Sequence, residues 1–246
     1  MRVFAKLTQT ELRLFLREPL IVFFTLLFPS ILVVILGSIP AFREPADSLG
    51  GGRVIDLYVV IAIAMCLGML AVQATPVVLA TYRERGILRR ISTTPARPVA
   101  LLAAQLVTSL LSAVISVTLV LIIGRVAFDV PIPAEFGSFA IAFLLCAGAV
   151  FAVGLFIAAV VPSGKAANTV GTLLFFPLMF FAGLWAPREV MPAVIRRVAD
   201  FTPLGAGERA LHDVAAGGWI NPLSLTVLVV YMLVFGLAAA RLFRWE

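Results

Sequence analysis

Six long apolar runs divide this chain of 246 residues, and none of them contains an acidic, basic or histidine side chain. A helix needs about 20 predominantly apolar residues to cross the hydrocarbon core of a bilayer. The runs that we assign as transmembrane helices are residues 20–39, 57–80, 99–123, 139–161, 169–186 and 222–240. They predict an all-α polytopic membrane protein in which residues 1–246 form a single transmembrane domain.

Composition excludes the soluble function classes. Hydrophobic residues make up 62% of the chain and charged residues 13%, whereas soluble globular proteins have about 45–50% and about 25%. A disordered chain would be poorer in apolar residues and richer in charge. The net charge of +6 does not indicate nucleic-acid binding, because the basic residues lie in short clusters between the apolar runs. Cys66 and Cys146 lie within apolar runs and are interpreted as small core residues.

The same basic clusters predict the orientation of the chain. Most of the 19 Lys and Arg residues lie in the N-terminal segment, in the loops after the second and fourth runs, and at the C-terminus. Cytoplasmic loops carry an excess of Lys and Arg, so we expect both termini in the cytoplasm. Arginine greatly outnumbers lysine, a bias typical of GC-rich bacteria, and we expect this multi-pass chain in a bacterial plasma membrane.

Residues 1–19 predict an amphipathic helix that lies at the membrane interface. Its four basic side chains share one stripe of the helix: Arg2, Lys6, Arg13 and Arg17. Apolar side chains occupy a different face. Glu11 and Glu18 fall among those apolar residues, where basic groups of another subunit could meet them. The alternative interpretation is an ordinary basic flank of the first span.

The longest stretch outside the runs, residues 187–221, predicts a pair of short re-entrant helices. Prolines and a Gly-Gly pair divide it into pieces near residues 190–201 and 204–215. The first piece has an apolar face, made by Val190, Val194, Ile195 and Val198. Broken helices persist at membrane depth only when they are packed on protein. We therefore expect this external helix pair to dip back into the outer leaflet before the last run.

The apolar runs lack the ionisable side chains that several function classes need. Ion-coupled transporters place such groups at membrane depth, and metalloenzymes need His or carboxylate ligands. Outside the runs, His212 beside Asp213 has no nearby nucleophile, and Gly164-Lys165 lacks the other residues of a Walker A loop. We expect no catalytic residue, no metal site and no cofactor bound by this chain, so that active transport would need energy from a partner.

The loop of residues 81–98 is the strongest indication of a partner protein. It predicts a helix over residues 83–91 with two arginines one turn apart. Its apolar side chains share one face: Ile87, Leu88 and Ile91. A glycine at position 86 costs about 1 kcal/mol of helix stability relative to alanine, and close approach of another protein to the backbone would offset this cost. Thr94 precedes Pro95 and is expected to end the helix. The alternative is a positive-inside loop without further function.

Three stretches of the chain carry a family resemblance. The first is Arg17-Glu18-Pro19, which leads into a run containing Phe28-Pro29 and Gly37. The second extends from Glu84 to Arg90 and is followed by Thr93-Thr94-Pro95. The third extends from Phe181 to Pro187 and is followed by Met191-Pro192 and Pro203-Leu204. Together they resemble type-2 ABC-transporter permeases, in particular the bacterial drug-exporter branch related to daunorubicin-resistance permeases.

This resemblance implies a six-helix exporter subunit with several partners. These would be a second permease subunit, identical or different, and two cytoplasmic ATPase subunits that bind ATP and Mg. The cytoplasmic loop would be the coupling helix that docks on the ATPase, with Arg83, Glu84, Arg85, Gly86, Ile87, Leu88, Arg89, Arg90 and Ile91. In that interface Glu84 could pair with the ATPase. Substrate would pass between the permease subunits near the first, second and fifth runs, along Phe23, Phe24, Phe28, Phe175, Phe176, Phe180 and Trp185.

The leading functional hypothesis is therefore the permease subunit of an ATP-driven exporter that moves a lipophilic, drug- or antibiotic-like compound out of the cell. ATP hydrolysis is expected on a separate chain, so this chain is not itself an enzyme. Export of a lipid or lipid-linked glycan is the alternative within the same class. A passive membrane channel and a membrane-embedded enzyme are the alternatives from other classes.

Overall fold

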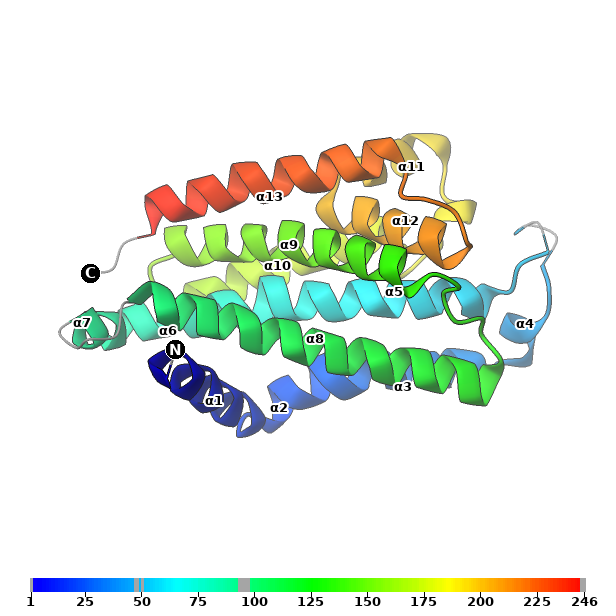
Figure 1. Ribbon diagram of the computed structural model, residues 1–246. Helices are drawn as coiled ribbons and strands as arrows, with labels where there is room; N and C mark the ends of the chain where they lie inside the picture. The colour runs from blue at the N-terminus through cyan, green and yellow to red at the C-terminus, as the bar shows by residue number, and fades with distance from the viewer. Residues whose placement is uncertain (1, 47–48, 50, 93–97, 244–246) are drawn as a thin grey trace.

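The computed structural model describes residues 2–46, 49, 51–92 and 98–243 as an elongated bundle of helices (Figure 1). Among these described residues, five helices or near-continuous helical rods are long and apolar enough to cross a membrane. They are Pro19–Gly37, Val54–Glu84, Ala100–Phe128, Phe136–Val160 and Pro222–Leu242. Five of the predicted spans thus lie in helices of sufficient length, and the prediction of an all-α polytopic membrane protein is confirmed.

The first two rods are not uniform α-helices. The first combines α2 (Pro19–Val22), the π-helical turn η1 (Phe23–Leu27) and α3 (Phe28–Gly37). The second combines α5 (Val54–Gly68), the π-helical turn η3 (Met69–Ala74) and α6 (Thr75–Glu84). The other three long helices are α8 (Pro98–Phe128), α9 (Phe136–Val160) and α13 (Pro222–Leu242). A short helix, α4 (Pro40–Arg43), lies between the first two rods.

The remaining predicted span, residues 169–186, differs from the structure. The corresponding helix is α10 (Gly164–Phe181), which has 18 residues and is not among the five candidate spans. It begins earlier than expected, and Lys165 and Asn168 in its first turns lower its hydropathy. At about 1.5 Å per residue it is about 27 Å long. It starts beside the end of α6 and leads to the short helices at the opposite end of the bundle, so a sixth crossing remains a prediction.

The second rod forms the centre of the bundle (Figure 1). It is apolar on all sides, and 89% of its most apolar stretch is buried inside the chain, as expected of a helix surrounded by others. α5 packs against α3, α8 and α12 (Pro203–Ala215), and η3 packs against α9 and α10. By contrast only 22% of the corresponding stretch in α13 is buried, so α13 lies at the periphery with much of its apolar surface exposed.

Two short helices are present where the sequence predicts them: α11 (Ala193–Asp200) and α12 (Pro203–Ala215), after the 3-10 turn η4 (Arg188–Val190). Thr202 Oγ1 caps α12 by accepting a hydrogen bond from the Gly205 backbone N–H at 3.1 Å. α12 packs into the core against α9, α13 and α5. The apolar face of α11 remains exposed, with Val194 at 73%. The position of this pair in the outer leaflet remains a prediction.

The N-terminal segment forms α1 (Arg2–Leu16), which packs against α8. Glu11 is buried, and both of its carboxylate oxygens accept hydrogen bonds from the Tyr82 hydroxyl, at 3.0 and 3.1 Å. Burial raises the pKa of the Glu11 carboxyl. The expectation that Glu11 meets a basic group of another subunit is therefore wrong, because its partner belongs to α6 of the same chain.

Candidate functional site

Two π-helical turns shape one flank of the bundle, and each lies just before a proline. η1 precedes Pro29 and η3 precedes Pro76. A proline cannot donate to the carbonyl four residues earlier, and π turns commonly mark such irregular points in helices. The Cys66 thiol donates to the Thr25 carbonyl at 3.5 Å, four residues before Pro29. Cys66, interpreted from sequence as a plain core residue, thus supports this irregular turn.

Glycines on two neighbouring helices allow close packing around η3. A Cβ atom on Gly154 of α9 would lie 1.9 Å from the Ala71 carbonyl oxygen. A Cβ atom on Gly171 of α10 would lie 2.5 Å from the Val72 carbonyl oxygen. Any side chain at either position would collide with backbone, which has little freedom to move. The backbone of η3 is therefore fixed between α9 and α10.

A groove of about 490 Å³ lies between the first rod, η3, the start of α6, and α10. Its apolar lining is Leu20, Ile21, Phe24, Phe28, Met69, Ala74, Val77, Phe175 and Phe176. Its polar lining is Thr25, Gln73, Asn168 and Thr172. Leu20, Phe24 and Phe176 are each at least 45% exposed, so the groove opens on the flank of the chain.

The structure brings four of the seven predicted pathway residues into this groove: Phe24, Phe28, Phe175 and Phe176. Two others lie beside it. Phe23 packs edge-on against Phe24 with ring centroids 5.2 Å apart, and Trp185 lies 6.1 Å from Phe176. Phe180 packs against Phe181 and is not among the lining residues.

Sequence reasoning missed the polar side chains of the groove. Gln73, Asn168 and Thr172 line it. The carboxamides of Gln73 and Asn168 form no hydrogen bond to another residue that the structure describes. Amides both donate and accept hydrogen bonds, so Gln73 and Asn168 can bind an uncharged polar group of a ligand. The sequence could have indicated these residues, because Gln73 lies inside an apolar run and Asn168 directly precedes one. None of the described lining residues is charged, so this groove provides for binding rather than acid–base chemistry.

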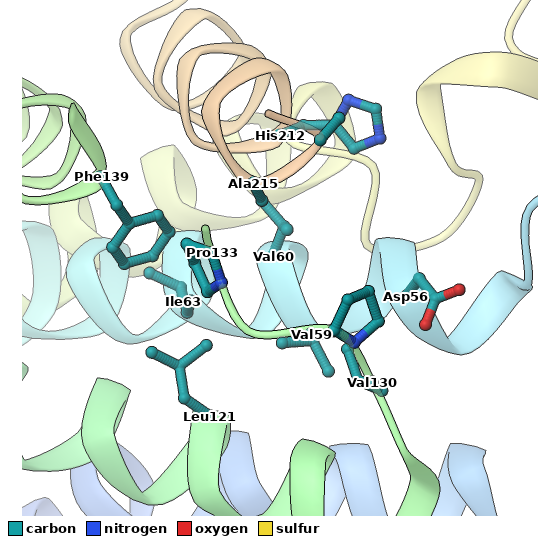
Figure 2. A pocket seen from close by; sticks show the side chains of 12 residues that line it. Asp56, Val59, Val60, Ile63, Leu121, Val130, Pro133, Phe139, His212 and Ala215 are labelled. Carbon is teal, nitrogen blue, oxygen red and sulfur yellow. The ribbon is translucent and has the colours of Figure 1, made fainter. Parts of the chain in front are cut away.

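A second cavity, of about 180 Å³, lies between α5, α8, the α8–α9 connection and α12. Figure 2 shows apolar side chains around it, among them Ile63, Leu121 and Phe139. Asp56 and His212 lie at its edge (Figure 2), and the Asp56 carboxylate is bound by the Arg53 guanidinium at 2.7 and 3.0 Å. The carboxylate at the edge of this cavity is therefore engaged in an ion pair at the start of α5.

The described part of the predicted partner-binding loop lies at the other end of the bundle, the end where α1 begins and α13 ends (Figure 1). The continuous helix expected over residues 83–91 is wrong, because α6 ends at Glu84 and α7 (Ile87–Ser92) begins after Gly86. Gly86 has φ +67°, a conformation that glycine adopts readily and other residues rarely do. Its N–H donates to the Arg83 carbonyl at 3.0 Å, which closes the end of α6. Gly86 thus serves a turn rather than the interior of a helix.

The side chains of this loop differ in exposure, because Leu88 is buried inside the chain whereas two arginines are exposed. Leu88 is only 1% exposed and packs with Leu79, Leu101 and Ala158 inside the chain, so the expectation that it packs on a partner is wrong. Arg85 and Arg90 are exposed, and Ile87 is half-buried. The side chains of Arg89 and Ile91, and Thr93-Thr94-Pro95 as a whole, lie outside the described part of the structure.

Arg83 and Glu84, also expected to face the partner, are engaged within the chain. The Arg83 guanidinium donates to the Ala159 carbonyl at 3.2 Å and to the Val161 carbonyl. Glu84 Oε2 accepts a hydrogen bond from the Gly164 backbone N–H at 3.0 Å. The idea that Glu84 is available to pair across an interface is therefore corrected, although its side chain remains exposed.

Comparison with known proteins assigns the chain to a family. The model of the ABC-2 type transporter family matches residues 2–216. The match covers the groove, the α6–α7 turn, and helices α11 and α12. No curated protein matches the sequence. Because the family match extends over most of the 246 residues, this chain belongs to the ABC-2 type transporter family.

Proposed function

We propose that this chain is the permease subunit of an ATP-driven exporter that carries an uncharged, lipophilic, drug- or antibiotic-like compound out of a bacterial cell. Membership of the ABC-2 family implies association with ABC ATPase partners. The observation that carries the choice of substrate is the groove, which is largely aromatic and aliphatic. Its two carboxamides have no hydrogen-bond partner among the residues that the structure describes, and none of its described lining residues is charged.

The absence of charge in the described lining supports a neutral compound over a phosphate-bearing one as the proposed substrate. An ion moved from water into an apolar site loses hydration, and without a partner of opposite charge the penalty is several kcal/mol. A phosphate-bearing lipid or lipid-linked glycan would meet no Lys or Arg among these lining residues. A neutral compound would bury its apolar body against Phe28 and Phe175 and could hydrogen-bond to Gln73 or Asn168.

The same geometry supports the proposed assembly. Because the groove opens on the flank of the bundle, a second permease subunit placed there would enclose it. Two ATPase subunits, which hold ATP and Mg, would dock at the end that carries α7, where Arg85 is exposed. The described ends of the chain lie at that same end (Figure 1), which agrees with the proposed cytoplasmic location of both termini.

Replacement of the two carboxamides tests this function in a purified complex with the ATPase, reconstituted in lipid nanodiscs. In Gln73→Leu and Asn168→Leu, stimulation of ATP hydrolysis by a neutral lipophilic compound should need about 2- to 10-fold more compound, since one hydrogen bond contributes about 0.5–1.5 kcal/mol. The control is Gln9→Leu on the exposed surface of α1. Unchanged dose dependence in both groove variants, or stimulation only by an anionic lipid-linked glycan, would refute the assignment.

A further inference from the structure

The last two residues of α6 hold the turn between α9 and α10. The Arg83 guanidinium donates to the carbonyls of Ala159 and Val161, at the C-terminal end of α9. Glu84 Oε2 accepts from the backbone N–H of Gly164, the first residue of α10, at 3.0 Å. We call these two side chains the α6 clamp. Consecutive residues of one helix thus bind the ends of two others.

The charges of the clamp match the helix ends that they bind. Carbonyl groups at a helix C-terminus are left without partners and carry partial negative charge, which a guanidinium complements. Amide groups at a helix N-terminus carry partial positive charge, which a carboxylate complements. Arg83 and Glu84 follow this rule at α9 and α10 respectively. Exchange of the two charges would make both contacts repulsive.

Close packing restricts movement between α6 and α10 at the same point. A Cβ atom on Gly164 would lie 2.2 Å from Thr81 Oγ1 of α6. Ser163 Oγ also accepts a hydrogen bond from the Ala166 N–H at 3.2 Å and so caps the first turn of α10. The start of α10 is therefore attached to the end of α6 by packing as well as by the clamp.

The clamp lies between α7 and the groove. Two residues after Glu84, Gly86 turns the chain into α7, and Leu88 of α7 packs with Leu79 of α6 and with the end of α9. Four residues after Gly164, Asn168 begins the series of α10 side chains that line the groove. Packed elements therefore connect α7 to the groove without interruption.

We propose that the α6 clamp transmits displacement of α7 to α10 and thereby couples ATP hydrolysis on the partner to the shape of the groove. This inference rests on the proposed function. Arg83 and Glu84 are then positioning residues, which act through α10 and contact neither ATP nor substrate. Their loss should uncouple hydrolysis from transport while docking of the ATPase persists.

The test uses the full chain reconstituted with its ATPase, comparing Glu84→Ala, Glu84→Gln and Glu84→Asp with the parent. Lys165→Ala is the matched control, because it removes an exposed charge from the first turn of α10. Four quantities are measured: recovery of the ATPase with the chain, basal hydrolysis, hydrolysis stimulated by the neutral compound, and compound transported per ATP hydrolysed.

Glu84→Ala should keep ATPase recovery and basal hydrolysis near the parent values and reduce transport per ATP at least tenfold. Glu84→Gln, which keeps an acceptor oxygen but no charge, should give an intermediate loss, and Glu84→Asp should restore most of the coupling. Lys165→Ala should behave as the parent. If Glu84→Ala does not insert into the membrane, Glu84→Gln decides the question, because it preserves the shape of the side chain.

Two results would overturn the clamp. One is that Glu84→Gln transports as much compound per ATP as the parent, together with Glu84→Ala if that variant inserts into the membrane. The other is loss of the ATPase from the Glu84 variants, which would make Glu84 a docking residue instead. A parent complex that neither retains an ATPase nor transports a neutral compound would overturn the proposed function itself, and this proposal with it.

Discussion

Glu208 shows how strongly a single position in this chain can depend on its surroundings. It lies on α12 with 4% of its surface exposed. Burial raises the pKa of the Glu208 carboxyl to about 8, with Glu189 and Asp213 adding to the rise and Arg188 and Arg209 opposing it. The carboxyl is therefore mainly protonated at neutral pH, although in the sequence Glu208 is simply one acidic residue of the segment before the last apolar run.

The raised pKa of Glu208 predicts how stability depends on pH. Between its ordinary pKa near 4.5 and about 8, the folded chain binds a proton that the unfolded chain has released. Stability from this group is therefore complete below pH 4.5 and falls as pH rises through about 8. The melting temperature of the parent should fall more steeply from pH 6 to pH 9 than that of Glu208→Gln. Parallel curves for the two proteins would contradict this, and exposed Glu18→Gln is the control.

Residue-level prediction from sequence succeeded for apolar patterns and failed for long-range polar contacts. The aromatic side chains belong to apolar runs that can be recognised from neighbouring residues alone, and four of the seven predicted pathway residues line the groove. The partner of Glu84 is 80 residues away in sequence, and that of Glu11 is 71 residues away. No local pattern specifies such pairs, because they depend on how the helices pack. Gly86 is different, since a glycine that follows a helix is a known signal of its end.

At the scale of elements, the long apolar runs predict the positions of the long helices, whereas the π-helical turns within them depend on tertiary packing. The run predicted over 222–240 corresponds to α13 at Pro222–Leu242. The π turns η1 and η3 interrupt rods that the sequence pattern predicts as uniform. The prolines that follow them were visible in the sequence, but their effect depends on packing partners such as Cys66 and Gly154.

The packing around η3 predicts opposite outcomes for two glycine substitutions. In Gly154→Ala the new Cβ atom would collide with the Ala71 carbonyl, and overpacking of this kind costs about 1–3 kcal/mol. In Gly236→Ala on α13 nothing lies within 4 Å of the new atom, and alanine favours a helix over glycine by roughly 0.5–1 kcal/mol. Thermal unfolding in detergent should thus show a lower melting temperature for Gly154→Ala and an equal or higher one for Gly236→Ala. Equal losses in both would contradict the tight contact.

At the scale of the whole molecule, the groove and the α7 end are separated along the bundle and joined by α10. The family match places the chain among ABC-2 type transporters, and the groove is the observation on which the proposed substrate class rests. The sequence predicted the polytopic helical fold from hydropathy. It could not predict that the polar side chains Gln73 and Asn168 gather beside four phenylalanines, because they come from different helices.

Transport into inside-out proteoliposomes that contain the chain and its ATPase tests the central claim most directly. The measurement compares a neutral lipophilic compound with an anionic derivative of the same size, with ATP, without ATP, and with a hydrolysis-deficient ATPase. We expect ATP-dependent accumulation of the neutral compound, little accumulation of the anionic one, and none without hydrolysis. Accumulation that is independent of ATP would indicate a passive channel, and preference for the anionic compound would contradict an uncharged groove as the substrate site.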